Sequence, residues 1–122
     1  MLALAMPTPG VADPIFGLWR TPPDNQGSYG EITIGPCDEA ICGIITGGSA
    51  GAGAAPTADL DQRAVFWDMR AQGQGRYSGG KVWSPQMDLT VNGRLTLTGD
   101  ALDVTGCLLG VCRSGGVWQR IR

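Results

Sequence analysis

The stretch that decides the fold runs from Met87 to Ile121 and reads MDLTVNGRLTLTGDALDVTGCLLGVCRSGGVWQRI. Within it, three short runs place apolar residues at every second position, with charged or hydroxyl side chains between them, and in a fourth run Val117, Gln119 and Ile121 alternate with Trp118 and Arg120. These runs are 87–91, 95–98, 102–105 and 117–121. A period of two with one apolar side is typical of a half-buried antiparallel strand. The stretch therefore predicts four successive strands that close over a core.

Turn signals separate the first three of these strands. Asn92-Gly93 predicts a two-residue hairpin turn, because both central positions of a type I′ turn need a positive φ. Gly99-Asp100 predicts the next turn. Upstream, the same reasoning predicts strands at 15–20, 29–36, 41–46, 64–70 and 76–83. Gly79 and Gly80 inside the last of these predict a bend or bulge, which a small barrel needs at its corners.

Length and composition place all of these strands in one domain. The chain has 122 residues, with 20 glycines and 8 prolines, and no window carries a helical apolar repeat. We therefore predict an all-β fold, a small antiparallel up-and-down barrel of about eight to nine strands. The barrel domain is expected to span 13–122. Gly47–Pro56 has few bulky side chains and is predicted to form a flexible loop.

The first twelve residues are apolar and rich in small residues. They resemble the end of a secretory signal peptide, with Gly10-Val11-Ala12 as a small-residue cleavage site. A disordered or docked N-terminal arm is the alternative. A signal peptide implies a periplasmic or secreted protein.

The charged residues exclude several classes of function. The net charge is −2, with no run of Lys or Arg, which argues against nucleic acid or an anionic membrane surface as the main partner. No stretch is apolar for long enough to span a bilayer. The chain has no histidine, and its carboxylates are spread along turns and outward strand positions. We therefore expect neither an enzyme nor a cofactor.

The four cysteines form two C-x4-C pairs, Cys37 with Cys42 and Cys107 with Cys112. A tetrathiolate zinc site is one alternative, but each pair flanks a hairpin loop and an oxidising compartment favours disulfides. We predict local disulfides within each pair, which stabilise the fold by roughly 2–3 kcal/mol each, and no metal site.

Large aromatic side chains recur along the predicted strands. They are expected either to fill the core or to line a ligand cavity, and a core this small favours filling. The candidate ligand-binding residues are Trp19, Tyr29, Trp67, Tyr77 and Trp83.

Two segments at the ends of the domain together resemble the lipocalin signature. Gly17-Leu18-Trp19 lies in the first predicted strand, and Trp118-Gln119-Arg120 lies in the last. In that signature a Gly-x-Trp opens the barrel and a basic residue of the final strand packs across the indole. The resemblance gives Gly17, Trp19, Trp118 and Arg120 structural roles.

A wider set of motifs, in the same order, resembles the bacterial domain-of-unknown-function family 2147. The matching segments are Asp13-Pro14-Ile15-Phe16-Gly17-Leu18-Trp19, Pro36-Cys37, Ile41-Cys42-Gly43, Tyr77-Ser78-Gly79-Gly80-Lys81-Val82-Trp83-Ser84-Pro85, Val104-Thr105-Gly106-Cys107 and Trp118-Gln119-Arg120. The resemblance implies a secreted or periplasmic, lipocalin-like barrel without established activity or catalytic residues. The chain departs from the family pattern at Gly47–Pro56 and at Gln86–Leu89.

These observations lead to two hypotheses about function. The first is a non-enzymatic, monomeric barrel that binds a small apolar or amphipathic molecule. The second is a protein-interaction module, such as an inhibitor of a secreted hydrolase that acts through Thr21–Gly27 and Gly47–Pro56. An envelope protein with a structural or stress role and no ligand cannot be separated from the second by sequence.

Overall fold

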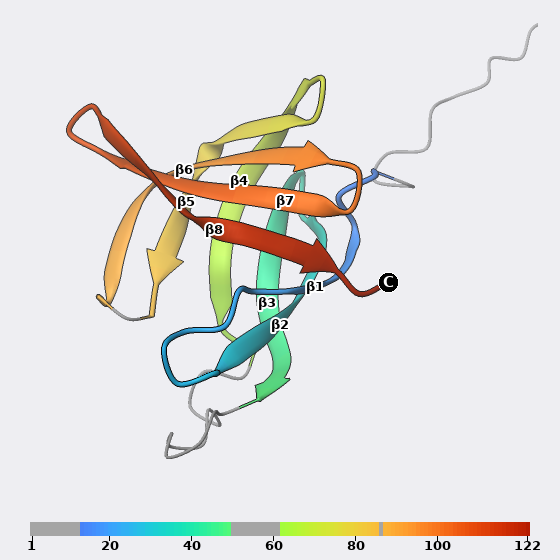
Figure 1. The fold of residues 1–122 in the computed structure, drawn as a ribbon. Helices are drawn as coiled ribbons and strands as arrows, with labels where there is room; N and C mark the ends of the chain where they lie inside the picture. The colour runs from blue at the N-terminus through green and yellow to red at the C-terminus, as the bar shows by residue number, and fades with distance from the viewer. Residues whose placement is uncertain (1–12, 50–61, 86) are drawn as a thin grey trace, which may run out of the picture.

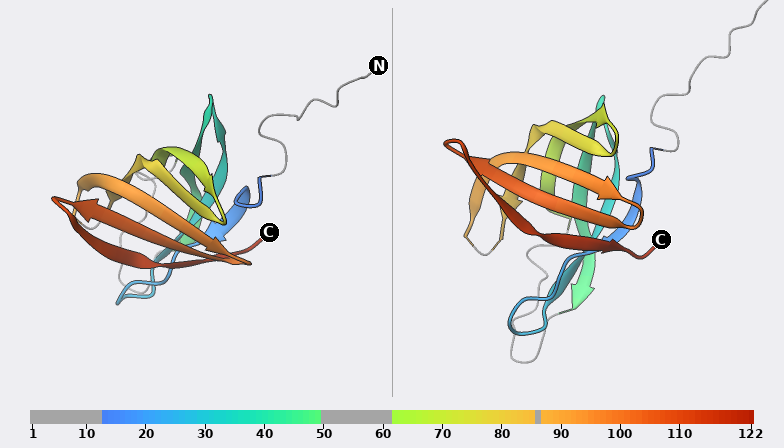
Figure 2. Two further views of the ribbon diagram at one scale, coloured as in Figure 1. Left: turned by 90° about the horizontal axis from the view of Figure 1, so that it is seen from above. Right: turned by 45° about the horizontal axis from the view of Figure 1, so that its top comes forward.

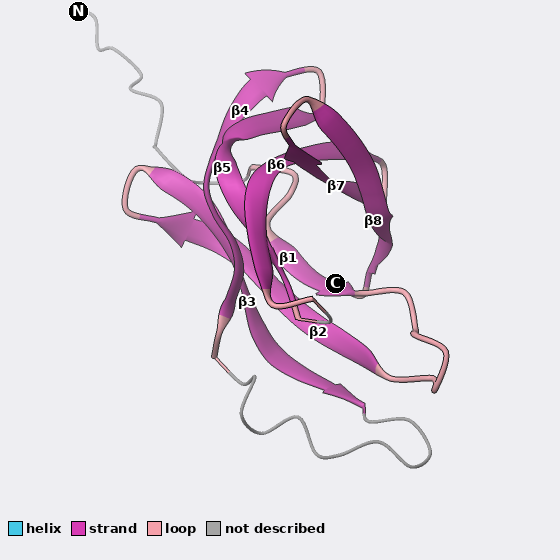
Figure 3. Ribbon diagram, turned by 90° about the vertical axis from the view of Figure 1, so that its left-hand side faces the viewer, coloured by secondary structure: helices cyan, strands magenta, loops and turns pink. Residues whose placement is uncertain are grey.

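Eight antiparallel strands form a closed barrel in which each strand pairs with its neighbour in sequence and β1 pairs with β8 (Figure 1). The computed structural model describes residues 13–49, 62–85 and 87–122. The strands are β1 (Gly17–Arg20), β2 (Tyr29–Cys37), β3 (Ala40–Ser49), β4 (Ala64–Gly73), β5 (Arg76–Ser84), β6 (Leu89–Thr98), β7 (Ala101–Leu108) and β8 (Val111–Arg120). Figure 3 shows these strands encircling the core. In these ranges no helix is long and apolar enough to cross a membrane.

The predicted all-β, up-and-down architecture is confirmed, but the hairpin turn at Asn92-Gly93 is wrong. Both residues lie inside β6, where Asn92 pairs with Lys81 and Cys107. The strands predicted at 87–91 and 95–98 therefore belong to the single strand β6, and the stretch from Met87 to Ile121 supplies three strands instead of four. The turn at Gly99-Asp100 is confirmed, because it joins β6 to β7.

Gly93 meets a packing requirement rather than a turn requirement. Its φ is not positive, and it pairs with Gly80 on one side and Gly106 on the other. A Cβ at Gly93 would lie 2.4 Å from the Cε of Met69 and 2.4 Å from a methyl carbon of Val82. Gly93 and Gly106 thus make room for side chains of Met69, Val82 and Val91 in this part of the barrel.

The predicted bulge at Gly79-Gly80 is confirmed. The register between β5 and β6 shifts between Tyr77 and Gly80, and Gly79 has a φ of 89°. A Cβ at Gly80 would lie 2.0 Å from the backbone oxygen of Trp67, so the neighbouring strand approaches too closely for any side chain there. The predicted loop at Gly47–Pro56 begins later than expected, because 47–49 belong to β3; residues 50–56 lie outside the described residues, as do 1–12.

The core is a single cluster of inward-facing aliphatic and aromatic side chains from all eight strands and the segment before β1. Its fully buried members are Ile15, Trp19, Ile32, Ile34, Phe66, Met69, Leu95 and Leu102. The described residues include no buried polar side chain that lacks a hydrogen-bond partner. The apolar alternation read from the sequence therefore marks the buried face correctly at Leu95, Leu102 and Val104. It is wrong in the runs 87–91 and 117–121, where Met87, Leu89, Val117 and Ile121 are exposed and Trp118 is buried instead.

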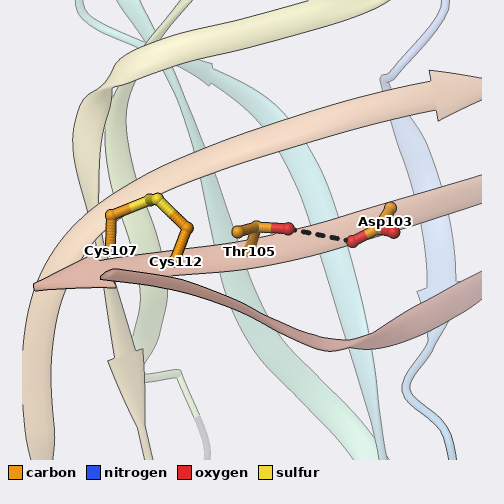
Figure 4. Close-up of a disulfide and its surroundings, with 4 residues drawn as sticks. All are labelled: Asp103, Thr105, Cys107 and Cys112. Carbon is orange, nitrogen blue, oxygen red and sulfur yellow. Dashed lines mark hydrogen bonds between the residues drawn. A yellow bond between two sulfur atoms is a disulfide. The ribbon is translucent and has the colours of Figure 1, made fainter. Parts of the chain in front are cut away.

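Both predicted disulfides are present, and they lie at opposite ends of the barrel. Cys37–Cys42 spans the turn between β2 and β3, and Cys107–Cys112 spans the turn between β7 and β8. Figure 4 shows the second disulfide beside Asp103, whose carboxylate accepts a hydrogen bond from Thr105. The same oxygen accepts one from Ser114 on β8, so the carboxylate joins β7 to β8 where their register shifts.

Candidate functional site

Trp19 and Arg120 close the barrel where its first and last strands meet. The two residues are paired across β1 and β8, and the guanidinium carbon of Arg120 lies 4.4 Å from the centroid of the indole ring. The indole N–H donates to the backbone oxygen of Ile15 at 2.9 Å. Trp19 is fully buried, so this predicted ligand-binding residue has its whole surface in contact with the protein.

Arg120 also fixes the segment before β1. Its Nη1 donates to the backbone oxygen of Phe16 at 3.0 Å, and its Nη2 donates to that of Pro14. Its Nε donates to Asp100 in the β6–β7 turn at 2.8 Å. One guanidinium therefore joins three segments at this end of the barrel, using the planar set of donors that lysine lacks.

The other predicted ligand-binding aromatic residues divide into buried and half-buried members. Tyr77 and Trp83 belong to the core, whereas Tyr29 and Trp67 are half-buried. The guanidinium of Arg63 lies 3.5 Å from the Trp83 ring centroid. Tyr77 and Trp83 therefore pack in the same core cluster as Trp19.

The polar groups on two of these rings have defined partners, and a third ring lies under a guanidinium. The Trp83 indole donates to Asp88 at 2.9 Å, and the Tyr77 hydroxyl donates to Asp13 at 2.7 Å. The Tyr29 ring lies under Arg20, with 4.4 Å between the guanidinium carbon and the ring centroid. These contacts are the ones that packed aromatic side chains make with their polar edges and faces.

The hydroxyl of Tyr77 is held in its neutral form. Burial raises the pKa of Tyr77, and the hydrogen bond to Asp13 and the charge of that carboxylate raise the pKa further. The phenol therefore stays a donor across the physiological pH range. The same carboxylate oxygen accepts a hydrogen bond from the backbone N–H of Ile15 at 2.9 Å. Asp13 thus ties the N-terminal segment to β5.

A cleft of about 590 Å³ opens beside this segment, at the end of the barrel that carries the Cys37–Cys42 disulfide. Its walls come from the segment before β1, the β2–β3 hairpin and β4. The lining residues are Asp13, Phe16, Pro36, Asp38, Glu39, Ala40, Ile41, Met69, Arg70 and Ala71. None of the five aromatic residues predicted to bind a ligand lines it.

The cleft combines an apolar lining with charged groups. Met69 is fully buried, Ile41 is nearly so, and Phe16 packs against the core cluster. Asp38 and Glu39 contribute two carboxylates from the hairpin turn. Such a lining suits a molecule with an apolar body and a hydrogen-bond donor or cationic group.

Arg70 is the basic residue of the lining. Its Nη1 donates to the backbone oxygen of Glu39 at 3.4 Å, which links β4 to the β2–β3 turn. Sequence reasoning missed this site because its residues come from three distant segments. The available signal was the pair of acidic residues enclosed by Cys37 and Cys42.

Comparison with known proteins agrees with the geometry of the barrel. Among solved structures, the chain is similar to protein HP1028 from the human pathogen Helicobacter pylori, which belongs to the lipocalin family. The two chains superpose with a TM-score of 0.67 at 15% sequence identity, over 88% of this chain and 83% of the other. This likeness shows a lipocalin-like fold. No functionally curated protein matches the chain.

Residues 17–120 match a family of bacterial proteins, and the match extends from the first strand to the last. It includes the Trp19–Arg120 contact and both disulfides. The chain therefore belongs to the family described as "Uncharacterized protein conserved in bacteria (DUF2147)".

Proposed function

We propose that this protein is a non-enzymatic, periplasmic or secreted binding protein that holds a small amphipathic molecule in the cleft between the N-terminal segment, the β2–β3 hairpin and β4. The observation that carries the proposal is the cleft itself. Its volume of about 590 Å³ lies within the range of pockets that bury small molecules, and its lining is apolar with acidic groups. The two disulfides support an oxidising compartment.

The centre of the barrel is a poorer place for a ligand. A Cβ at Gly43 would lie 2.5 Å from the Phe66 ring, and a Cβ at Gly106 would lie 2.8 Å from a methyl carbon of Val91. Where not even a methyl group fits, no ligand atom fits without displacing a core side chain. The proposal therefore places the ligand at the cleft and gives Trp19, Tyr77 and Trp83 the role of core residues.

The acidic groups define the class of ligand. Asp38 and Glu39 lie on the β2–β3 turn, and the Arg70 contact beside them is made to a backbone oxygen rather than to a carboxylate. A ligand with an amine would be attracted to these carboxylates while its apolar part covers Phe16, which is only half-buried. We therefore expect selectivity for cationic amphiphiles over anionic ones of the same length.

The proposal is tested by titrating the full chain with octylamine, octanol and octanoate and following amide chemical shifts by NMR. Octylamine should bind most tightly, with the largest shifts at Ile41, Met69 and Ala71. Glu39→Gln should weaken octylamine binding, whereas Glu31→Gln, which removes a carboxylate that faces Arg20 instead, should not. Equal binding of octanoate, or shifts confined to other parts of the barrel, would contradict the proposal.

A second candidate function is a protein-interaction module, such as an inhibitor of a secreted hydrolase. The loop between β1 and β2 favours this second function, because the loop is exposed and its backbone is held by hydrogen bonds within the loop. The carboxylate of Asp24 accepts hydrogen bonds from the backbone N–H groups of Gln26 at 2.8 Å and Ser28 at 2.9 Å. Preorganised exposed loops bind partners at a small entropic cost. Asp24→Ala should weaken any such complex without altering octylamine binding at the cleft.

A further inference from the structure

The turn between β7 and β8 carries an apolar tip on the outside of the protein. Leu109 is 93% exposed, and its neighbours Leu108 and Val111 are 50% and 57% exposed. Figures 1 and 2 show this turn projecting beyond the body of the barrel. The tip lies at the end opposite the cleft, so a role for the tip does not depend on the proposed ligand.

Folding does not require a leucine at this position. Leu109 is the first residue of a two-residue turn and has a φ of 53°, a left-handed conformation that costs a bulky residue energy. The other disulfide-bonded hairpin has the same spacing, and Asp38 occupies the same turn position with a φ of 56°. Aspartate suits this conformation and an aqueous surface, whereas leucine suits neither. The exposed leucine is therefore a candidate for contact with another body.

The tip is rigid before it meets a partner. Cys107 and Cys112 are paired across β7 and β8 and joined by the disulfide. Asp103 accepts hydrogen bonds from Thr105 and Ser114 further along the same two strands. The backbone of the tip thus has little conformational entropy left to lose when it meets another body.

A second group of exposed apolar residues lies at the same end of the barrel. In an up-and-down barrel the β5–β6 and β7–β8 turns share one end. Met87, in the β5–β6 turn, is 70% exposed, and Leu89 at the start of β6 is 40% exposed. Together with the hairpin tip, they give one end of the molecule two apolar projections from separate turns (Figure 1).

Basic residues lie near the apolar tip. From Val104 to Arg122 the sequence contains no acidic residue, and Arg113 follows Cys112 near the start of β8. Lys81 lies in the same cross-strand row as the Cys107–Cys112 disulfide. The opposite end carries both the carboxylates of Asp13, Asp38, Glu39 and Asp100 and the guanidinium groups of Arg70 and Arg120.

Acidic residues near the apolar tips already have partners within the protein. Asp88 accepts from the Trp83 indole, and Asp24 accepts from two backbone N–H groups. These hydrogen bonds come from neutral donors and leave both carboxylates charged. The orientation therefore follows from geometry, because the apolar tip and the cleft lie at opposite ends of the barrel.

We propose that the β7–β8 tip, defined as residues 108–111, together with Met87 and Leu89, inserts into the interface of a phospholipid bilayer and orients the barrel with its cleft facing away from the membrane. Insertion of exposed apolar side chains at a turn, supported by basic neighbours, is a mode of interfacial membrane binding. It needs no run of basic residues, so it is compatible with the low net charge of the chain.

A bilayer fits these observations better than a protein partner does. Specific protein interfaces bury about 800 Å² on each partner and require a matching surface, whereas this tip is one hairpin wide and convex. Two separate apolar projections at one end can enter a fluid interface together without a preformed complement. The anionic headgroups of a phospholipid surface also match Arg113 and Lys81.

The test is flotation of the full chain with vesicles of phosphatidylcholine alone or mixed with phosphatidylglycerol. The protein should float with both, and more strongly with the anionic mixture. Leu109→Asp, which installs the residue found at the matching turn position of the other hairpin, should lower the partition coefficient about tenfold or more. Thermal stability of this variant should be unchanged or higher, because aspartate tolerates the left-handed conformation.

Val117→Asp is the matched control, because Val117 is an exposed apolar residue on β8 outside the tip. It should leave vesicle binding unchanged. A second measurement uses Leu109→Trp, whose emission should be quenched by brominated lipid, while that of Val117→Trp should not. Failure of the natural protein to float with either vesicle overturns the proposal, as does flotation that Leu109→Asp leaves intact. A tip that instead mediates a dimer or a protein complex, without vesicle binding, overturns it as well.

Discussion

The guanidinium of Arg120 lies 4.4 Å from the centre of the fully buried Trp19 ring while it donates hydrogen bonds to the backbone oxygens of Phe16 and Pro14. Its Nε also donates to Asp100. The first strand is only four residues long, so backbone pairing alone holds it weakly. One side chain therefore supplies much of the attachment between the N-terminal segment and the last strand.

Arg120→Lys should lower the free energy of unfolding by about 2 kcal/mol, because lysine keeps the charge but cannot donate to three separated acceptors. Denaturant titration of the full chain measures the difference. Arg20→Lys is the control, since Arg20 also lies over an aromatic ring but is largely exposed and its distance to Glu31 is 3.9 Å. Its effect should be below about 0.5 kcal/mol. Equal effects of the two substitutions would show that Arg120 does not hold the barrel closed.

Tyr77→Phe should reduce stability at neutral pH by about 1–2 kcal/mol, because the buried hydroxyl donates to the Asp13 carboxylate. The pKa of Tyr77 is raised in the folded protein, so its contribution is complete below the unfolded pKa of about 10. Above that pH the unfolded chain loses the proton first, and the stabilisation falls as the pH rises toward the folded pKa.

Denaturant titrations at a series of pH values test this dependence. The difference between the natural protein and Tyr77→Phe should shrink above about pH 10. Asp13→Asn should make the alkaline loss of stability smaller, because it removes the charge that contributes to the raised pKa. A difference that is constant from neutral to alkaline pH would contradict the assignment.

Gly93→Ala should destabilise the fold by about 1–3 kcal/mol, because the added methyl group would meet Met69 and Val82. Thermal unfolding followed by circular dichroism provides the measurement. Gly35→Ala is a matched control in β2, where a Cβ would have no heavy atom within 4 Å and φ is not positive. It should change stability by less than about 0.5 kcal/mol. NMR of the Met69 methyl group distinguishes this packing role from a role in a hairpin turn. A destabilised Gly93→Ala variant with an unchanged Met69 methyl signal would contradict the packing role.

The two disulfides should contribute similar amounts, because each closes a loop with a sequence separation of 5. Replacing both cysteines of one pair by serine should cost about 2 kcal/mol in the chain-entropy account. The pairs lie at opposite ends of the barrel, so their effects should add. Unfolding of the two double variants and of the variant lacking all four cysteines checks this. A combined loss far from the sum would show that the two ends are coupled.

Much of the fold could be read from local patterns. Alternating residues such as those around Leu95 and Leu102 identify the buried face because side chains alternate along any strand. The two C-x4-C pairs identify the disulfides, because a sequence separation of 5 places the two cysteines opposite each other on the strands of a tight hairpin. The hairpin turn predicted at Asn92-Gly93 was wrong, because a sequence does not distinguish a glycine that adopts a positive φ from a glycine that is needed for close packing.

The candidate sites were less predictable. Trp19, Tyr77 and Trp83 were considered for a ligand cavity, and the structure uses them to fill the core. The cleft escaped prediction because its walls come from segments that meet only when the barrel closes. Leu109 escaped it because an apolar residue between two cysteines reads equally well as part of a buried strand.

The sequence by itself determined most of the strands, part of the buried face, the cysteine pairs and the residues that close the barrel, since each depends on spacing within a short segment or on a known signature. Only the tertiary structure decided which glycines face other side chains, which aromatic residues are covered and where a cleft and an apolar tip are left. Those outcomes depend on which distant strands become neighbours, and on the volume their side chains occupy once the sheet has closed on itself.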